Sequence, residues 1–330
     1  MLRPPHRRSR AALQKIGSND SARTILIALA ANVVIAVAKL VTGLMSGSTA
    51  LLAEAAHSLA DASNEVLLGI SLRRSAKPAD DRHPMGHGRE RFLWAFMAAI
   101  ASFLIGGCFS VAMAIRQLTR GELTGNITAA WIVLAVAFLG DGFSFVQSLR
   151  QAQSDARERG RDVWFHLLRS SDPTVRAVVV EDGAALIGII IAAAGLLLSH
   201  QLHSGRPDAI ASLLIGLLMA ATAFGLARPL ADFLVGKSLP PEMLEEIRSV
   251  IASDDAVAEI LSVQAVYIGP EEVIVAAKVR PAPGLTTEQL GRAMDNLDQA
   301  LRKASPFVAD VYIDVTSHAA TDGDEHESRH

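Results

Sequence analysis

Four ionisable side chains lie close together in AEAAHSLADASNE, residues 53–65, a segment that otherwise consists mostly of small and apolar residues. They are Glu54, His57, Asp61 and Glu65. His57 and Asp61 are four residues apart, so in a helix they share one face and lie one turn apart. An imidazole and carboxylates form a ligand set suited to divalent transition metals, zinc above all. This spacing therefore indicates a metal site.

A second pair of carboxylates, Glu181 and Asp182, lies inside the apolar run VVVEDGAALIGIII. At membrane depth an ionised Asp costs about 2.5–3.5 kcal/mol on insertion scales. Such groups should therefore face the interior of a helix bundle, pair with one another or bind a ligand. A bound metal would offset the cost. Because His must lose its proton to bind a metal, the same groups offer a route to proton coupling.

The elements that must position these residues are six apolar segments, at about residues 25–45, 50–72, 92–116, 128–149, 175–199 and 208–235. The chain has 330 residues, half of them hydrophobic, which is too apolar for a typical soluble domain. Each segment is close to the roughly 20 residues that cross a bilayer as a helix. The first exceeds the roughly 7–15-residue apolar core of a secretory signal, so we expect a retained membrane helix. The sequence predicts an all-α, six-helix transmembrane bundle.

Lys and Arg gather in three places: the N-terminal tail, the segment between the second and third apolar runs, and the segment between the fourth and fifth. Basic loops tend to stay in the cytoplasm. This alternation predicts that both termini are cytoplasmic.

The chain after about residue 239 alternates charged and apolar residues and reads as a soluble domain. PPEMLEEIRSVIAS predicts a helix, ILSVQAVYIG and EVIVAAKVRP a hairpin, LTTEQLGRAMDNLDQALRKA a helix capped by Thr286 or Thr287, and ADVYIDVTS a strand. The order αββαβ indicates a small α+β fold with helices on one face of a sheet. The predicted domains are a tail (1–22), the membrane domain (23–237), the α+β domain (238–317) and a disordered tail (318–330).

Several motifs together resemble the cation diffusion facilitator family of proton-coupled exporters of zinc and related divalent metals. They are ALLAEA and HSLADASN, then HPMGHGRERFLWAF, and DPTVRAVVVEDGAALIG. The similarity covers almost the whole chain. It implies a transport site made by His57, Asp61 and Asp182. It also implies a cytoplasmic αββαβ, ferredoxin-like or metallochaperone-like domain through which a homodimer forms.

One position departs from the family pattern, which has His or Asp four residues before the final Asp, where this chain has Val178. Glu181, Glu54 or water is then the fourth ligand. The Glu-Asp pair resembles a subgroup of the family that includes a mitochondrial and nuclear zinc-transporter-like member. Zinc is the favoured cargo, and manganese, cobalt and iron are alternatives.

Other polar residues have competing interpretations. Glu54 is either a ligand or a partner of Lys39, whereas Asp141 and Glu65 are expected to pack or form ion pairs. In DDRHPMGHGRE, His83 and His87 form either a weak metal site for loading or regulation or, the preferred interpretation, simply part of a turn. The tail histidines, His318, His326 and His330, are expected to be solvated.

The predicted function is proton-coupled export of a divalent cation by alternating access in a homodimer. The expected partners are the cation, protons, the lipid bilayer and a second copy of the chain, with no permanently bound cofactor and no nucleic acid. We expect a location in a bacterial inner membrane and no enzymatic activity. Two alternatives stay open: an intramembrane metalloenzyme, although the chain has no HExxH motif, and a non-transporting scaffold or coregulator with a vestigial metal site.

Overall fold

The computed structural model describes residues 18–120, 128–158, 173–270 and 272–316. These residues fall into two compact units. One contains the described residues up to Leu72 together with Trp94–Leu230, and the other contains Arg73–Leu93 together with the described residues from Ala231 on. The predicted tail 318–330 lies outside the described residues, and α2 begins at Ser18, within the segment predicted as the N-terminal tail.

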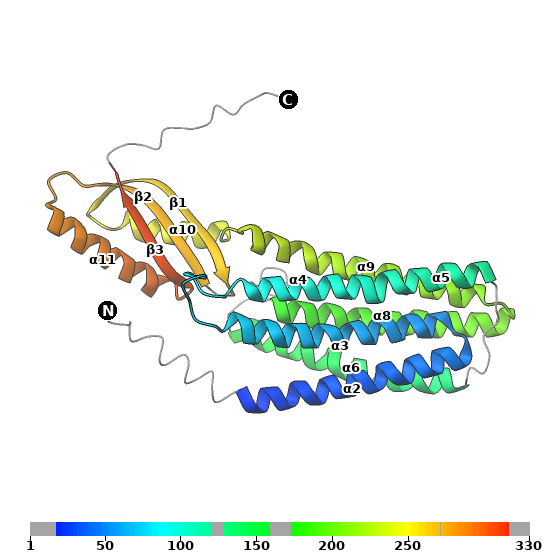
Figure 1. Cartoon of the computed structure of the whole chain (residues 1–330). Helices are drawn as coiled ribbons and strands as arrows, with labels where there is room; N and C mark the ends of the chain where they lie inside the picture. The colour runs from blue at the N-terminus through cyan, green and yellow to red at the C-terminus, as the bar shows by residue number, and fades with distance from the viewer. Residues whose placement is uncertain (1–17, 121–127, 159–172, 271, 317–330) are drawn as a thin grey trace, which may run out of the picture. The chain divides into compact units, whose positions relative to one another are not determined.

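Long helices dominate the first unit (Figure 1). In chain order they are α2 (Ser18–Ser46), α3 (Thr49–Ser75), α4 (Glu90–Ser102), α5 (Phe109–Arg120), α6 (Thr128–Glu158), α8 (Pro173–Leu202) and α9 (Arg206–Val235). A π-helical segment, η1 (Phe103–Cys108), joins α4 to α5 without a break. Each of the six apolar segments therefore lies in a helix, as predicted.

Four helical stretches within the described residues are long and apolar enough to cross a membrane: Glu90–Thr119, Thr128–Arg150, Val179–Leu202 and Arg206–Val235. The described part of α2 contributes a shorter apolar stretch, Asn32–Ser46. Helix α3 has the length of a span, but its ionisable residues make it more polar than the other five. The polar helix of the bundle is thus the one that carries His57 and Asp61.

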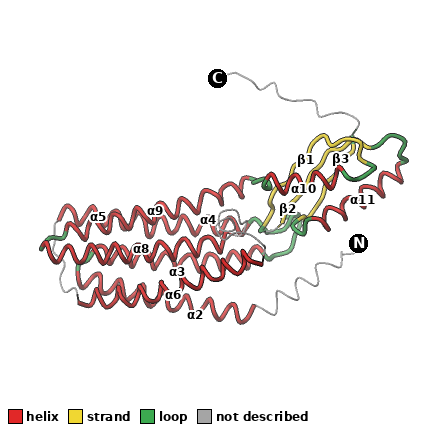
Figure 2. Tube along the Cα trace, turned by 180° about the vertical axis from the view of Figure 1, so that it is seen from behind, coloured by secondary structure: helices red, strands yellow, loops and turns green. Residues whose placement is uncertain are grey.

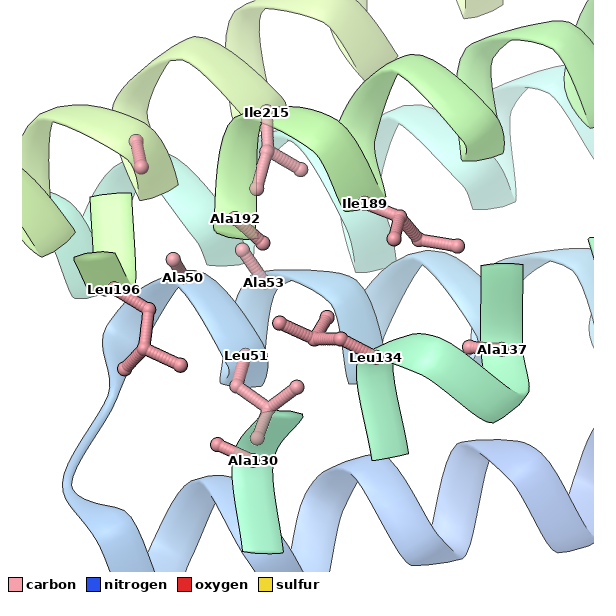
Figure 3. Close-up of a cluster of buried hydrophobic side chains, with 11 residues drawn as sticks. Ala50, Leu51, Ala53, Ala130, Leu134, Ala137, Ile189, Ala192, Leu196 and Ile215 are labelled. Atoms are coloured by element: carbon pink, nitrogen blue, oxygen red, sulfur yellow. The ribbon is translucent and has the colours of Figure 1, made fainter. Parts of the chain in front are cut away.

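Small side chains allow the membrane helices to approach one another closely. Figure 3 shows a buried cluster in which α3, α6, α8 and α9 meet, made of Ala50, Leu51, Ala53, Ala130, Leu134, Ala137, Ile189, Ala192, Leu196, Ala211 and Ile215. Most of these residues are alanines. In lipid, where helix association depends on close packing, short side chains at the interface bring backbones together.

The second unit contains the predicted αββαβ order (Figure 2). Its elements are α10 (Pro241–Ala252), β1 (Val257–Gly269), β2 (Glu272–Pro281), α11 (Thr287–Ala304) and β3 (Val308–Val315). The sheet order is β1-β2-β3, with β1 antiparallel and β3 parallel to the central strand β2. The hairpin is the one that the sequence predicts, and α11 connects β2 to its parallel neighbour β3.

Alternation along β2 explains which face of the sheet is covered. Val273, Val275, Ala277 and Val279 are buried, while the residues between them are more exposed. Helices α10 and α11 contact each other and the sheet. Of the two predicted caps of α11, Thr286 is the one that forms a capping box with Gln289. The α+β fold is therefore confirmed.

Candidate metal-binding sites

Helix α3 places His57 and Asp61 together, as their spacing predicts. His57 Nε2 lies 3.4 Å from Asp61 Oδ2, and His57 is almost fully buried. Among the described residues, neither ring nitrogen of His57 has a hydrogen-bond partner, and Asp61 Oδ1 also lacks one. Buried polar atoms usually have a hydrogen-bond partner, so these atoms suit a bound species that accepts electron pairs. A divalent cation is such a species.

The two neighbouring carboxylates of α8 are held by different helices. Glu181 Oε1 accepts a hydrogen bond from Asn64 Nδ2 of α3 at 2.5 Å. Asp182 Oδ2 accepts from the hydroxyls of Ser144 and Ser148 of α6, at 3.0 and 3.1 Å. Adjacent residues on a helix point about 100° apart, which accounts for the difference.

We call His57, Asp61, Glu181 and Asp182 the membrane set. The carboxylate of Asp61 interacts electrostatically with Asp182 and Glu181, so α3 and α8 bring the predicted ligands near one another. In the described part of the chain, however, no three of the four have ligand atoms that all lie within 4.8 Å of one another. The side chain of Val178 is not among those described. The assignment of the membrane set as a metal site stays a prediction.

Glu54 pairs with Lys39, one of the two interpretations of this residue. Lys39 Nζ lies 3.1 Å from Glu54 Oε2, donates to Ser58 Oγ at 2.9 Å, and lies 3.7 Å from Asp141 Oδ2. Asp141 thus forms an ion pair, which is one of the roles expected for it. Glu65 accepts a hydrogen bond from Asn32 of α2 at 2.7 Å. These contacts tie α2, α3 and α6 together beside the membrane set.

The start of α3 is held by Asp208, which the sequence analysis did not single out. Its fully buried carboxylate accepts from Ser48 Oγ at 2.6 Å, from the N–H and hydroxyl of Thr49 at 2.6 and 2.9 Å, and from the Ala50 N–H at 3.3 Å. A helix start leaves N–H groups without intrahelical partners, and an acidic oxygen satisfies them. Here one oxygen comes from α9, and Ser48, just before α3, supplies another by accepting from the Leu51 N–H at 3.1 Å. The signal in the sequence was that Asp208 is an isolated acidic residue at the start of an otherwise apolar segment.

The second unit holds a compact cluster of potential ligands between α3 and α4. Asp80, His83 and His87 have ligand atoms that all lie within 4.8 Å of one another, and we call them the loop cluster. His83 Nδ1 is 3.1 Å and His87 Nε2 is 3.6 Å from an Asp80 oxygen. Sequence reasoning found both histidines and missed Asp80. The spacing Asp-x-x-His-x-x-x-His was the signal that would have found it.

Local backbone geometry builds the loop cluster. Asp80 Oδ1 accepts from the N–H groups of Arg82 and His83, at 2.9 and 2.7 Å. The hydrogen bond from the His83 N–H, followed by contacts from the His83 ring and the Arg82 N–H, lowers the pKa of Asp80 below its ordinary value. A Cβ on Gly88 would lie 2.6 Å from the Ile268 carbonyl oxygen, so only glycine allows the loop to lie this close to β1. The turn, which was the preferred interpretation, is present, and metal binding by it stays a prediction.

Known proteins resemble this chain over most of its length. It is 28% identical to metal tolerance protein C4 of Arabidopsis thaliana over 256 residues. This aligned region covers 78% of this chain and 56% of that relative. It is 25% identical over 257 residues to the mitochondrial proton-coupled zinc antiporter SLC30A9 of Homo sapiens, covering 78% of this chain and 45% of the antiporter. This chain thus spans about half the length of these two relatives.

A shorter relative is the manganese efflux system protein MneP of Bacillus subtilis, 27% identical over 248 residues that cover 74% of this chain and 79% of MneP. The family described as the cation efflux transmembrane domain matches residues 25–235, which run from within α2 to the end of α9. The resemblance stated from the motifs is confirmed. The chain belongs to the cation efflux family, the cation diffusion facilitators, whose members are integral membrane transporters rather than enzymes.

Proposed function

We propose that this protein exports a divalent metal cation, zinc in the first place, in exchange for protons. The observation that carries the proposal is the buried His57–Asp61 pair. Among the described residues, both ring nitrogens of His57 and Oδ1 of Asp61 lack hydrogen-bond partners, and the pair lies near the carboxylates of α8. Two relatives are named as a proton-coupled zinc antiporter and a manganese efflux protein, which supports a divalent cation as cargo. Imidazole with carboxylates favours zinc, and manganese, cobalt and iron are the alternatives to test.

In the proposed cycle the cation binds His57, Asp61 and Asp182, with Glu181 as the fourth ligand. His57 binds the metal only as the neutral imidazole, so metal binding and protonation of this residue exclude each other. After the bundle opens to the far side, protons displace the cation from its ligands and are carried back. A ligand set without thiolates holds the metal weakly enough to release it.

The arrangement of the protein in the membrane completes the proposal. The αββαβ domain dimerises, both termini face the cytoplasm, and the membrane is a bacterial inner membrane. The basic segments between the spans support this orientation. On this side of the membrane the loop cluster would bind the same kind of cation before transport or as a regulatory ion.

Metal flux into sealed proteoliposomes tests the proposal. Zinc, manganese, cobalt and iron are compared with and without a pH gradient, for the wild type and Asp61→Ala. The matched control is Ser63→Ala, on the same helix, where the hydroxyl donates to the Leu59 carbonyl. We expect gradient-driven flux in the wild type and control and none in Asp61→Ala. Normal flux in folded Asp61→Ala would show that the site assignment is wrong. No flux of any ion with folded, dimeric wild type would favour the non-transporting scaffold.

A further inference from the structure

Lys39 of α2 is a cation buried inside the membrane domain. Its side chain is fully inaccessible, and so is that of Glu54, its closest acidic partner. An ammonium group has three N–H donors and no acceptor. Here it faces three oxygen groups from two other helices: Glu54 and Ser58 of α3 and Asp141 of α6, at 3.1, 2.9 and 3.7 Å.

The second oxygen of the Glu54 carboxylate is directed against helix α8. Glu54 Oε1 has no hydrogen-bond partner among the described residues. A Cβ added at Gly188 would lie 2.2 Å from this atom, so the carboxylate fills the space that the glycine leaves between α3 and α8. Glu54 is therefore enclosed between an ammonium group on one side and a helix backbone on the other.

This ion cluster adjoins the membrane set. Glu54 and Ser58 flank His57 along α3, and Lys39 interacts electrostatically with Asp61 as well. The carboxylates of this region exceed its cations, since Glu54 and Asp141 come in addition to those of the membrane set. A charge taken out of water must be neutralised nearby. Without Lys39, Glu54 and Asp141 would form a second group of oxygen ligands suited to a divalent metal.

We propose that Lys39 is a built-in cation that occupies the place of a second metal ion, holding Glu54 and Asp141 as its own counter-ions so that a single divalent cation binds in the membrane domain. The inference rests on the proposed function for the identity of that cation. It makes Lys39 and Glu54 positioning residues that set the number of bound ions, and it removes Glu54 from the ligands of the transported metal.

Counting tightly bound zinc on the purified full-length protein tests this proposal. All variants carry His83→Ala and His87→Ala, so that the loop cluster does not contribute. We expect Lys39→Met to bind one more zinc ion per chain than the parent. The triple variant Lys39→Met/Glu54→Gln/Asp141→Asn, which has neither the cation nor its counter-ions, should return to the parent count. An unchanged count in folded Lys39→Met would overturn the proposal.

Removing a buried ammonium group threatens folding, so zinc is also supplied during purification. If Lys39→Met folds only with zinc, the metal has replaced the ammonium group, as the proposal states. If it fails to fold even with zinc while the triple variant folds, the two carboxylates do not hold a metal, and the proposal is wrong.

A variant that keeps Lys39 gives an independent measurement. Glu54→Gln should leave the zinc count of the parent unchanged. Loss of that zinc ion, beyond the weakening of about 10–100-fold that removal of an outer contact gives, would show that Glu54 is a ligand of the transported metal and contradict the proposal. Because these readouts are numbers and affinities of bound ions, a failure of the proposed transport activity would appear separately, in the flux assay.

Discussion

The loop cluster and the membrane set are two groups of similar ligands that are assembled in different ways. The loop cluster lies within eight consecutive residues, and hydrogen bonds from its own backbone fix its central carboxylate. The membrane set is divided between α3 and α8, and its two α8 carboxylates are held by donors from two other helices. One group is gathered by a turn, and the other depends on how helices pack.

The difference bears on what each group is suited to do. Ligands fixed by a short turn keep their mutual distances whatever the rest of the protein does, which suits a site that captures ions. Ligands on separate helices move apart when the helices move, which suits a site that must release its ion. The following predictions test this division of roles, beginning with the largest expected effect.

Replacing one histidine in each group gives the sharpest contrast. We expect His57→Ala to lower zinc flux by about 100-fold or more, since even the outer contacts of a metal site are worth about 10–100-fold. We expect His87→Ala to lower flux by less than about tenfold, because in the proposed cycle the loop cluster is not part of the transport site. Initial rates in proteoliposomes measure both. Equal losses in the two variants would remove the distinction between the groups.

The donors that hold Asp182 should have a smaller effect. In Ser144→Ala/Ser148→Ala the carboxylate loses both hydroxyl donors, and we expect zinc affinity at the membrane set to fall by about tenfold, as for the outer contacts of other metal sites. Calorimetric titration of the full-length protein measures the affinity. Ser63→Ala removes a hydroxyl that bonds within its own helix and serves as the control. An affinity that did not change would mean that Asp182 is oriented by something other than α6.

The smallest expected effect concerns pH at the loop cluster. Because hydrogen bonds, first that of the His83 N–H, lower the pKa of Asp80, its carboxylate stabilises the turn fully above the ordinary Asp pKa of about 3.9. That contribution is lost only as the pH falls through the lower pKa of the folded turn. The carboxyl ¹³C shift of Asp80, followed in labelled protein, should therefore titrate below about pH 3.9.

His83→Ala is the matched variant for this titration. It removes the ring but keeps the backbone donor, so most of the lowering of the Asp80 pKa should persist. A midpoint at or above the ordinary value in the unsubstituted protein would show that the turn does not form as described.

Much of the architecture could be predicted because it depends on patterns that are local in the sequence. Apolar length located the six helices, β-branched runs joined by a Gly-Pro turn located β1 and β2, and the i,i+4 spacing placed His57 beside Asp61. The cap at Thr286 also followed from neighbouring residues, although two candidates remained. In each case the pattern consists of neighbouring residues, even where, as in the hairpin, the paired residues lie up to 24 positions apart, from Val257 to Pro281.

The features that sequence reasoning missed depend on distant contacts or on an overlooked spacing. Asp208 holds the start of α3 from about 160 positions further along the chain, and no local pattern encodes that distance. The partners of Glu181 and Asp182 likewise depend on which helices lie beside α8. Asp80 is different, since it is local. It was missed because only the histidines of its segment were considered.

Asp208 accepts four hydrogen bonds at the start of α3, whereas Asn64 and Glu65, further along the helix, each form one hydrogen bond to another helix, so the start is the more firmly held part. At about 1.5 Å per residue, Glu54 lies about 7.5 Å and Asp61 about 18 Å from Thr49 along the helix. A tilt of about 10° about the held end would displace Glu54 by about 1 Å and Asp61 by about 3 Å on this geometry. The first displacement leaves an ion pair intact, whereas the second exceeds a zinc–oxygen bond of about 2 Å. Pivoting at Asp208 would therefore amplify a small rotation into release of the ion while the bond between Lys39 and Glu54 holds.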